Sequence, residues 1–360
     1  MPSHPVKWYS SAMPGAPALR NVASDLIAVL DWCIVNGSAT TAVQSLVVAG
    51  NVATVTFASA HTFQTHQIIE INGVTGTLSA LNSQWRATGV TSLALTFAAT
   101  GIANGTAAGT ITCKTPGVGW QKAFSGTNKA AYRSQDVTGT RFYFRLDDTQ
   151  TTTATASGYE AMTDVDTGSN QFAPTPATIS KPSTSSARPW WVVGDGKTWF
   201  YCAANAGQGG TNAVVGAGFG DLDDFASAST YGCFLACSGT KGIVSTGGGG
   251  PSVCARSYTG TLGAVSIDRV DPPGHSGGYP SPVDEGFRLA GPVVIEQGAV
   301  ARGILRGALD CIPTLGPPVG TIVDSDSYGY PGLAIIFSSG SANPQDGGND
   351  RGAFNLIGPW

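Results

Sequence analysis

The chain of 360 residues has 19 Lys and Arg against 23 Asp and Glu, giving a formal net charge of −4, and only 12 % of its residues are charged. A partner with a phosphate backbone needs a basic footprint, so this balance argues against nucleic acid as the main partner. No apolar run approaches the ~20 residues of a membrane span, and the first residues lack the apolar core of a signal peptide. The 49 glycines, about twice the usual share, favour a mainly β protein with many turns.

The first 19 residues are an aromatic segment interrupted by four prolines, which exclude a helix. Trp8 and Tyr9 lie between these prolines. Two interpretations stay open for this segment. It is either an extended arm that lies on a neighbouring subunit or a strand of its own domain.

One helix is predicted over residues 21–36. Ser24 is the expected N-cap, or Asn21 if the helix begins earlier, and Asn36-Gly37 ends it. The apolar residues recur at spacings of three and four, which places them on one face: Leu26, Ile27, Leu30, Cys33 and Ile34.

Residues 38–114 read as a small β-sandwich or barrel of their own. Residues 52–57 alternate between polar and apolar side chains, and Ile68–Ile71 is a further apolar strand. Turn signals recur about every eight to twelve residues, as in small sandwiches and barrels. This module is either an insertion into a larger β domain or a tandem N-terminal domain.

A short aromatic strand is predicted over residues 141–146. Its alternation places Phe142, Phe144 and Leu146 on an apolar face. Arg141, Tyr143 and Arg145 share the opposite face, which we expect to be an interface, and the nearest acidic candidates to pair with these cations follow: Asp147, Asp148 and Glu160.

The rest of the chain, residues 115–360, is predicted to form the main β domain. Its clearest hairpin covers residues 190–203, with a turn at Gly194-Asp195-Gly196. The hairpin brings together large aromatic side chains, among them Trp191, Trp199 and Tyr201. They form either a platform that stacks on sugars or a packed core. The apolar end at Trp360 predicts a strand docked in a sheet or on a partner.

No motif in the sequence predicts catalysis, metal binding or a cofactor. Ser276 lies in a G-x-S-x-G match, but the prolines around it exclude the strand–turn–helix context of a nucleophile elbow. Asp164–Gly168 and Asp221–Asp224 resemble fragments of calcium loops without the full spacing, so Asx turns are the expected structure. The seven cysteines have no framework spacing and are expected to be free thiols.

A family resemblance rests on residues 119–168. The segments GW-x-K-x-F-S-G-T-N, Y-R-S, R-x-Y-x-R-x-D-D and G-Y-E-x-M-x-D-V-D-T-G resemble a family of tailed-bacteriophage virion structural proteins, and the likeness thins after Pro189. The module at 38–114 is similar to compact β domains found in phage structural proteins. Because the helix before it and Trp120 after it both match the family pattern, we expect an insertion.

The resemblance implies a tail-associated virion protein that is assembled in the cytoplasm of a bacterial host. It implies identical copies, as a trimer or hexamer, and other tail or neck proteins as partners, and it carries over no catalytic residue. The predicted fold is a β-sandwich or barrel main domain with an N-terminal arm and helix (residues 1–37) and the inserted module.

Three functions follow from these observations. The first is a non-enzymatic structural part of the tail, baseplate or neck, consistent with the depletion of charge in interface cores. The second is a tail-tip protein that binds a receptor or a host-surface glycan through the aromatic hairpin. The third is a glycan-degrading or esterase part of the tail.

Overall fold

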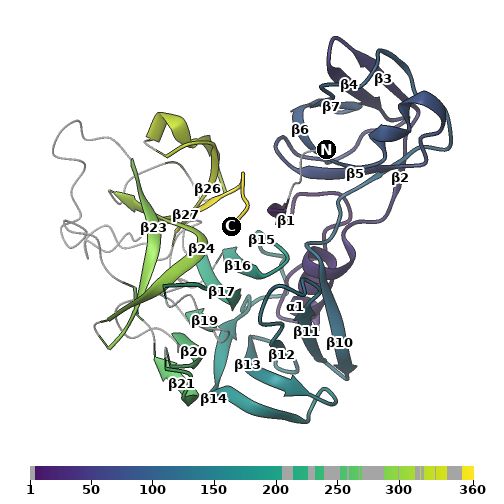
Figure 1. Cartoon of the computed structure of the whole chain (residues 1–360). Coiled ribbons are helices and arrows are strands. Elements are labelled where there is room, and N and C mark those ends of the chain that lie inside the picture. Colours follow the sequence, from purple (N-terminus) through teal and green to yellow (C-terminus); the bar gives the residue numbers. More distant parts are fainter. Residues whose placement is uncertain are drawn as a thin grey trace.

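The computed structural model describes residues 5–204, 214–225, 232–238, 252–257, 259–266, 268–269, 288–298, 300–312, 317, 320–328, 330–338 and 351–360. The protein is mainly β, with 52 % strand and 8 % helix, and its strands form several sheets, one a curled half-barrel. This confirms the predicted fold class. Figure 1 shows a body of packed sheets from which the module at 38–114 projects.

The first strand, β1 (Lys7–Ser10), pairs antiparallel with β15 (Trp190–Gly194) of the same chain. Tyr9 is fully buried, and its hydroxyl donates a hydrogen bond to the Pro116 carbonyl at 2.7 Å. From residue 5 onward the segment is therefore a strand of its own domain.

The helix begins with α1 (Asp25–Leu30) and continues through the π-helical turn η1 (Asp31–Asn36) to Gly37. Ser24 is the N-cap residue, as predicted, but its backbone is left-handed and its hydroxyl donates to Asn128 Oδ1, so its side chain does not cap the helix. Asp148 caps the helix from far along the chain. Its Oδ2 accepts hydrogen bonds from the backbone N–H of Leu26 at 2.9 Å and of Ile27 at 3.3 Å.

The module is one sheet with its own core. The sheet order is β2-β9-β5-β6-β7-β4-β3-β8, and the apolar core cluster inside it is drawn entirely from residues 46–113. The strands are β2 (Thr41–Ala42), β3 (Ser45–Ala49), β4 (Val52–Thr56), β5 (Ile68–Asn72), β6 (Gln84–Val90), β7 (Ala94–Ala98), β8 (Gly105–Thr106) and β9 (Thr112–Lys114), with the short helix η2 (Gly76–Leu81) between β5 and β6.

The two ends of the module lie side by side. The Ser38 N–H donates to the Thr115 carbonyl at 2.9 Å, and the Thr115 N–H donates to Ser38 Oγ at 2.9 Å. A Cβ added to Gly37 would lie 1.9 Å from the Thr115 carbonyl oxygen, so only glycine fits this close approach. The division of the chain into module and main domain stays a prediction.

Three further sheets build the body among the described residues. Their orders are β10-β11-β12-β13-β14, then β1-β15-β16-β17-β19-β20-β21, then β22-β23-β24-β27-β26-β25 with β18 paired to β24. The first contains β10 (Trp120–Gly126), β11 (Lys129–Ser134), β12 (Tyr143–Asp147), β13 (Thr153–Met162) and β14 (Gly168–Ser180). The second adds β16 (Thr198–Ala204), β17 (Val214–Asp221), β19 (Cys233–Ser238), β20 (Ser252–Arg256) and β21 (Leu262–Ser266) to β1 and β15. The third contains β18 (Asp223–Asp224), β22 (Asp268–Arg269), β23 (Arg288–Gln297), β24 (Val300–Ile312), β25 (Ile322–Asp324), β26 (Leu333–Ser338) and β27 (Arg351–Asn355), with the short helix η4 (Ser325–Tyr328) between β25 and β26.

The hairpin β15–β16 lies at the centre of the body, between the other two sheets (Figure 1). On one side Trp199 packs edge-on against Phe144 of β12, with ring centroids 4.9 Å apart. On the other side Phe200 stacks on Phe354 of β27 at 4.5 Å. A single large apolar cluster therefore connects the helix and all three sheets of the body.

Candidate functional site

The structure places most of the predicted binding-surface residues inside the protein. Five of them are at most 8 % exposed: Trp8, Tyr9, Tyr143, Trp199 and Tyr201. The buried side chains Trp199 and Tyr201 therefore do not form an exposed aromatic platform on the hairpin. The reason is that both faces of the hairpin are covered by other sheets, a relation between distant segments that the hairpin sequence does not contain.

The two other predicted tryptophans are partly buried. The Trp191 ring lies against the backbone at Gly320, where an added Cβ would come within 2.6 Å of it. Trp360 covers Gly307 in the same way and donates from its indole N–H to the Asn355 carbonyl at 2.7 Å. Both rings thus contact their own chain.

The face of Arg141, Tyr143 and Arg145 is paired within the five-stranded sheet. Arg145 donates from Nη2 to Asp166 Oδ1 at 2.7 Å and from Nε to the Val165 carbonyl at 2.7 Å. The Asp166 carboxylate also accepts from Lys129, and the bonds from these two cations lower its pKa. Arg145 therefore has its shortest ion pair with Asp166, which was not among the predicted partners. The predicted partner Asp147 also pairs with it, at a longer distance of 3.8 Å from Nη2.

The neighbouring residues complete this cluster. Arg133 lies over the Tyr143 ring at 5.1 Å and donates to the Tyr143 hydroxyl at 3.2 Å. Arg141 donates from Nε to the Ser134 carbonyl at 3.3 Å. The Asp164–Gly168 segment is a turn in which Asp164 Oδ1 accepts from the Asp166 N–H at 2.8 Å, as an Asx turn requires.

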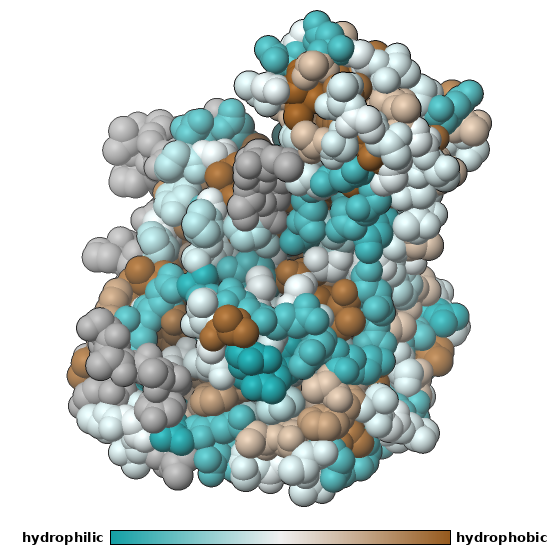
Figure 2. All heavy atoms as spheres, turned by 45° about the vertical axis from the view of Figure 1, so that its right-hand side comes forward, coloured by the Kyte–Doolittle hydropathy of each residue, from teal (hydrophilic) through white to brown (hydrophobic). Residues whose placement is uncertain are grey.

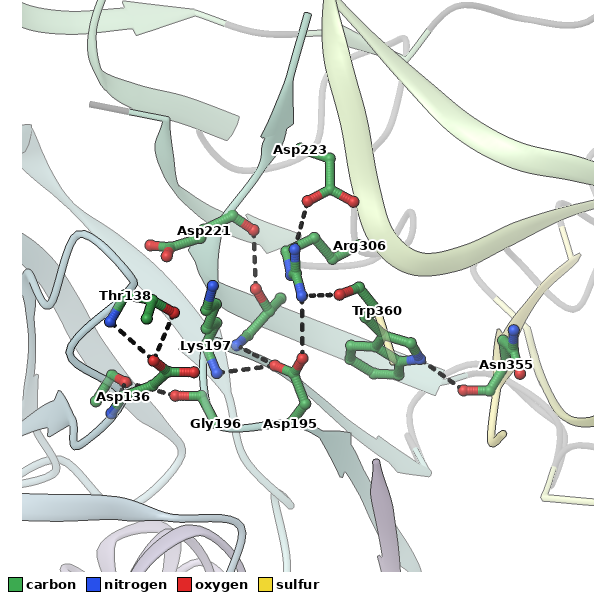
Figure 3. Close-up of polar contacts among 12 residues, drawn as sticks. Asp136, Thr138, Asp195, Gly196, Lys197, Asp221, Asp223, Arg306, Asn355 and Trp360 are labelled. Atoms are coloured by element: carbon green, nitrogen blue, oxygen red, sulfur yellow. Dashed lines mark hydrogen bonds and ion pairs between the residues drawn. The ribbon is translucent and has the colours of Figure 1, made fainter. Parts of the chain in front are cut away.

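A highly connected polar group among the described residues joins two sheets of the body and is shown in Figure 3. We call it the Arg306 junction: Asp195, Asp223, Arg306 and Trp360. Arg306 of β24 donates from Nη2 to Asp195 Oδ2 at 3.2 Å and to the Trp360 carbonyl, and from Nη1 to Asp223 Oδ1. One guanidinium therefore binds the hairpin turn, the short strand β18 and Trp360.

Asp195 binds the backbone of the hairpin turn in addition to Arg306. It is 4 % exposed, and its Oδ1 accepts from the backbone N–H groups of Lys197 and Thr198, each at 2.8 Å. The end of β11, where the loop to β12 begins, reaches the same place, because Ser134 Oγ donates to the Gly196 carbonyl at 2.5 Å. All three sheets of the body are thus tied to this one turn.

A second bond ties the same loop to the end of β17. Thr140 donates from Oγ1 to Asp221 Oδ1 at 2.6 Å and from its backbone N–H to Oδ2 at 3.1 Å. Burial raises the pKa of Asp221 although these bonds oppose the shift. Asp221 and Asp223, which resembled a calcium-loop fragment, therefore serve in two separate contacts. Asp221 links the β11–β12 loop to β17 of another sheet, whereas Asp223 binds Arg306 within the sheet that pairs β18 with β24.

A third polar group is fully buried under the helix. Lys181 and Asp148 form an ion pair in which both side chains are 0 % exposed. Lys181 Nζ also donates to the carbonyls of Val22 at 2.6 Å and Gln150 at 3.2 Å. Asp148 was predicted only as a partner for the arginine face, and Lys181 was not predicted, because a single lysine after a strand gives no local signal.

Two more ion pairs link elements of the body. Glu160 of β13 binds Arg256 of β20 through both oxygens, at 2.5 and 2.7 Å, so it too is unavailable to the arginine face. Arg302 of β24 lies 3.3 Å from Asp224 of β18. The buried charges that the structure describes therefore lie where different elements meet.

The remaining candidates for chemistry give no reactive group among the described residues. Six cysteine thiols are free and buried, and for Cys33, Cys202 and Cys254 burial raises the pKa, which disfavours a nucleophilic thiolate. In the described part of the chain no group of three His, Cys, Asp or Glu side chains is placed to hold a metal ion. Ser276 lies outside the described residues.

No protein-family model matches the sequence, and no curated protein is significantly similar to it. Within the described ranges, no helix has the length and apolar character needed to cross a membrane.

Proposed function

We propose that the chain is a non-enzymatic structural component of a tailed-phage virion, in the tail, baseplate or neck, and that it acts through contacts between subunits. The pattern at residues 119–168 motivates the choice of particle. The observation that carries the structural role is the use of mostly buried ion pairs as links between sheets, Arg306 with Asp195 and Arg256 with Glu160.

These links favour a rigid part over a reactive one. The Arg306 guanidinium bridges two carboxylates, and Asp195, the buried one, has further donors in the hairpin turn. Ion pairs of this kind contribute little net stability, but breaking one is costly because a buried charge remains. Such links therefore favour a fixed arrangement of the sheets, which a structural subunit needs.

The charge distribution of the module supports contacts with neighbours. Among residues 38–114 only Glu70, Arg86 and Lys114 are charged. We call residues 37–38 and 115–117, where the module joins the body, the stem. Glu70 lies 3.9 Å from Lys114, next to the stem, and Arg86 donates to the Leu356 carbonyl of the body at 2.6 Å, so these charges lie on the side of the module that faces the body.

The outer part of the module is uncharged and partly apolar. Strands β3, β4, β7 and β8 have no charged residue, and Val47 and Val52 are 37 % and 44 % exposed. Figure 2 shows apolar and weakly polar surface on the projecting module. Interface cores are depleted of charge, so this surface suits identical copies, as a trimer or hexamer, or other tail proteins.

The test is to locate the protein in purified particles of the phage that encodes it. Immunogold labelling with an antibody against the chain should mark the tail, and a cryo-electron microscopy map should show three or six copies around the axis. Purified particles that lack the chain would overturn the proposal. A single copy would overturn only the symmetric arrangement.

The glycan-binding alternative has no comparable support, since its predicted platform residues Trp199 and Tyr201 are buried.

A further inference from the structure

Lys181 and Asp148 bring an amine and a carboxyl group into contact in a site closed to solvent. Asp148 follows β12 and Lys181 follows β14, so the pair connects two strands that flank β13 in one sheet. The two residues are 33 apart in sequence, and both side chains are 0 % exposed. Few side-chain pairs with this chemistry are so completely removed from water.

The surroundings of Asp148 would activate its carboxyl carbon. The backbone N–H groups of Leu26 and Ile27 donate to Oδ2 at 2.9 and 3.3 Å. Two backbone donors aimed at one oxygen are the arrangement that stabilises the oxyanion of a tetrahedral intermediate. Oδ1, the other oxygen, contacts Lys181 Nζ.

Burial also favours the protonated form of the Asp148 carboxyl group. Lost hydration penalises a buried carboxylate, and the neutral carboxyl group is the form that an amine can attack. The raised pKa of Asp148, caused mainly by burial, agrees with this direction. The exclusion of water then opposes hydrolysis of any amide that forms.

We propose that Lys181 and Asp148 condense into an intramolecular isopeptide bond. Nζ attacks Cγ, the Nζ–Cγ bond forms, and the Cγ–Oδ1 bond breaks. Of the three ammonium hydrogens, one passes to Oδ1 before the attack and one when the intermediate collapses, so Oδ1 leaves as water. The third stays on the amide nitrogen and donates to the Val22 carbonyl, which already lies 2.6 Å from Nζ. The step needs no oxidant or cofactor.

The intact mass of the full chain, denatured and reduced, decides the proposal. We expect a mass one water, about 18 Da, below that of the sequence. A mass equal to that of the sequence, after prolonged incubation of the folded protein at neutral pH, would overturn it.

A double digest locates the lost water. Lys181 and Arg188 each precede a proline and no other Lys or Arg lies between Arg145 and Lys181, so trypsin leaves Asp148 and Lys181 on one peptide. A second cut after Glu160 should leave two fragments joined by the new bond. A lost water found instead at Asp195-Gly196, as a succinimide, would contradict the proposal.

Two variants serve as controls. Lys181→Arg keeps a cation but cannot form the amide, so its mass should equal that of its sequence. Asp148→Asn should condense with loss of ammonia, which lowers the mass by about 17 Da in place of 18. A lost water that persists in Lys181→Arg would exclude this residue as the nucleophile. The measured mass of the unsubstituted protein decides the proposal by itself. A variant that fails to fold therefore does not weaken the test.

Discussion

At the scale of single residues, Lys7 shows how the fold perturbs a titration. Lys7 is only 6 % exposed, and burial lowers its pKa from 10.5 to about 8. The negative charges of Glu70 and Asp195 act in the opposite direction and raise the pKa. Between about pH 8 and 10.5 the unfolded chain binds a proton that the folded chain does not. The contribution of Lys7 to stability therefore rises with pH across this window.

We predict that Lys7→Met raises the free energy of unfolding at pH 7 by about 1–3 kcal/mol, because it removes the cost of burying a charge. The advantage over the unsubstituted protein should shrink as pH rises towards 10.5, where the folded protein holds Lys7 neutral. Urea unfolding of both proteins at pH 7, 8.5 and 10 measures this. A difference that stays constant with pH would contradict the assigned cause.

Gly158 is a residue whose identity is fixed by packing. A Cβ added there would lie 2.2 Å from the ring of Phe172, which is 0 % exposed and has no room to move. We predict that Gly158→Ala lowers the free energy of unfolding by about 1–3 kcal/mol through overpacking. Gly352→Ala is the matched control in another strand, because its nearest neighbour is 3.8 Å away. Equal effects of the two substitutions in chemical denaturation would refute the packing argument.

At the scale of elements, the sequence predicted what is local and missed what is distant. The helix face, the β15–β16 hairpin and an aromatic strand follow from periodicity and turn residues within each segment. The strand, predicted at residues 141–146, is β12 (Tyr143–Asp147), and Arg141 lies before it with a left-handed backbone. The helix cap is 122 residues away from Leu26, and the cover of the hairpin comes from other sheets. No window of sequence around either element contains that information.

We predict that the Arg306 junction stabilises the contact between the β15–β16 hairpin and β24. Arg306→Ala should lower the free energy of unfolding by about 2–4 kcal/mol, since it leaves the Asp195 carboxylate, 6 % exposed, without its cation. Arg306→Lys should cost less but still more than about 1 kcal/mol, because an ammonium cannot reproduce the forked contacts.

Double-mutant cycles separate the two arms of this junction. The Asp223 side chain is 49 % exposed, so its coupling to Arg306 should be below about 1 kcal/mol. The coupling of Asp195 to Arg306 should exceed it. A larger coupling for Asp223 would mean that the exposed arm, and not the hairpin turn, holds the guanidinium.

At the scale of the whole molecule, the module and the body meet through few polar contacts. The Arg86 bond to Leu356 and the bond between the Gln67 and Thr115 side chains lie near the stem, and the module core contains no residue of the body. The ends at Ser38 and Thr115 already touch, so a short linker can replace what lies between them without straining the body.

We therefore predict that replacing residues 38–114 with a short Gly-Ser linker leaves a soluble body that unfolds cooperatively. The large cluster that joins the helix to the three sheets includes no module residue, so its buried area should be kept. The expected loss is limited to the contacts at the stem, where Gly37 and Gly117 pack closely against the backbone. Thermal unfolding followed by near-ultraviolet circular dichroism should show one transition, with the tryptophan signal of the hairpin core retained. A truncated chain that aggregates or unfolds gradually would show that the module is an integral part of the body, since the connection itself demands no rearrangement.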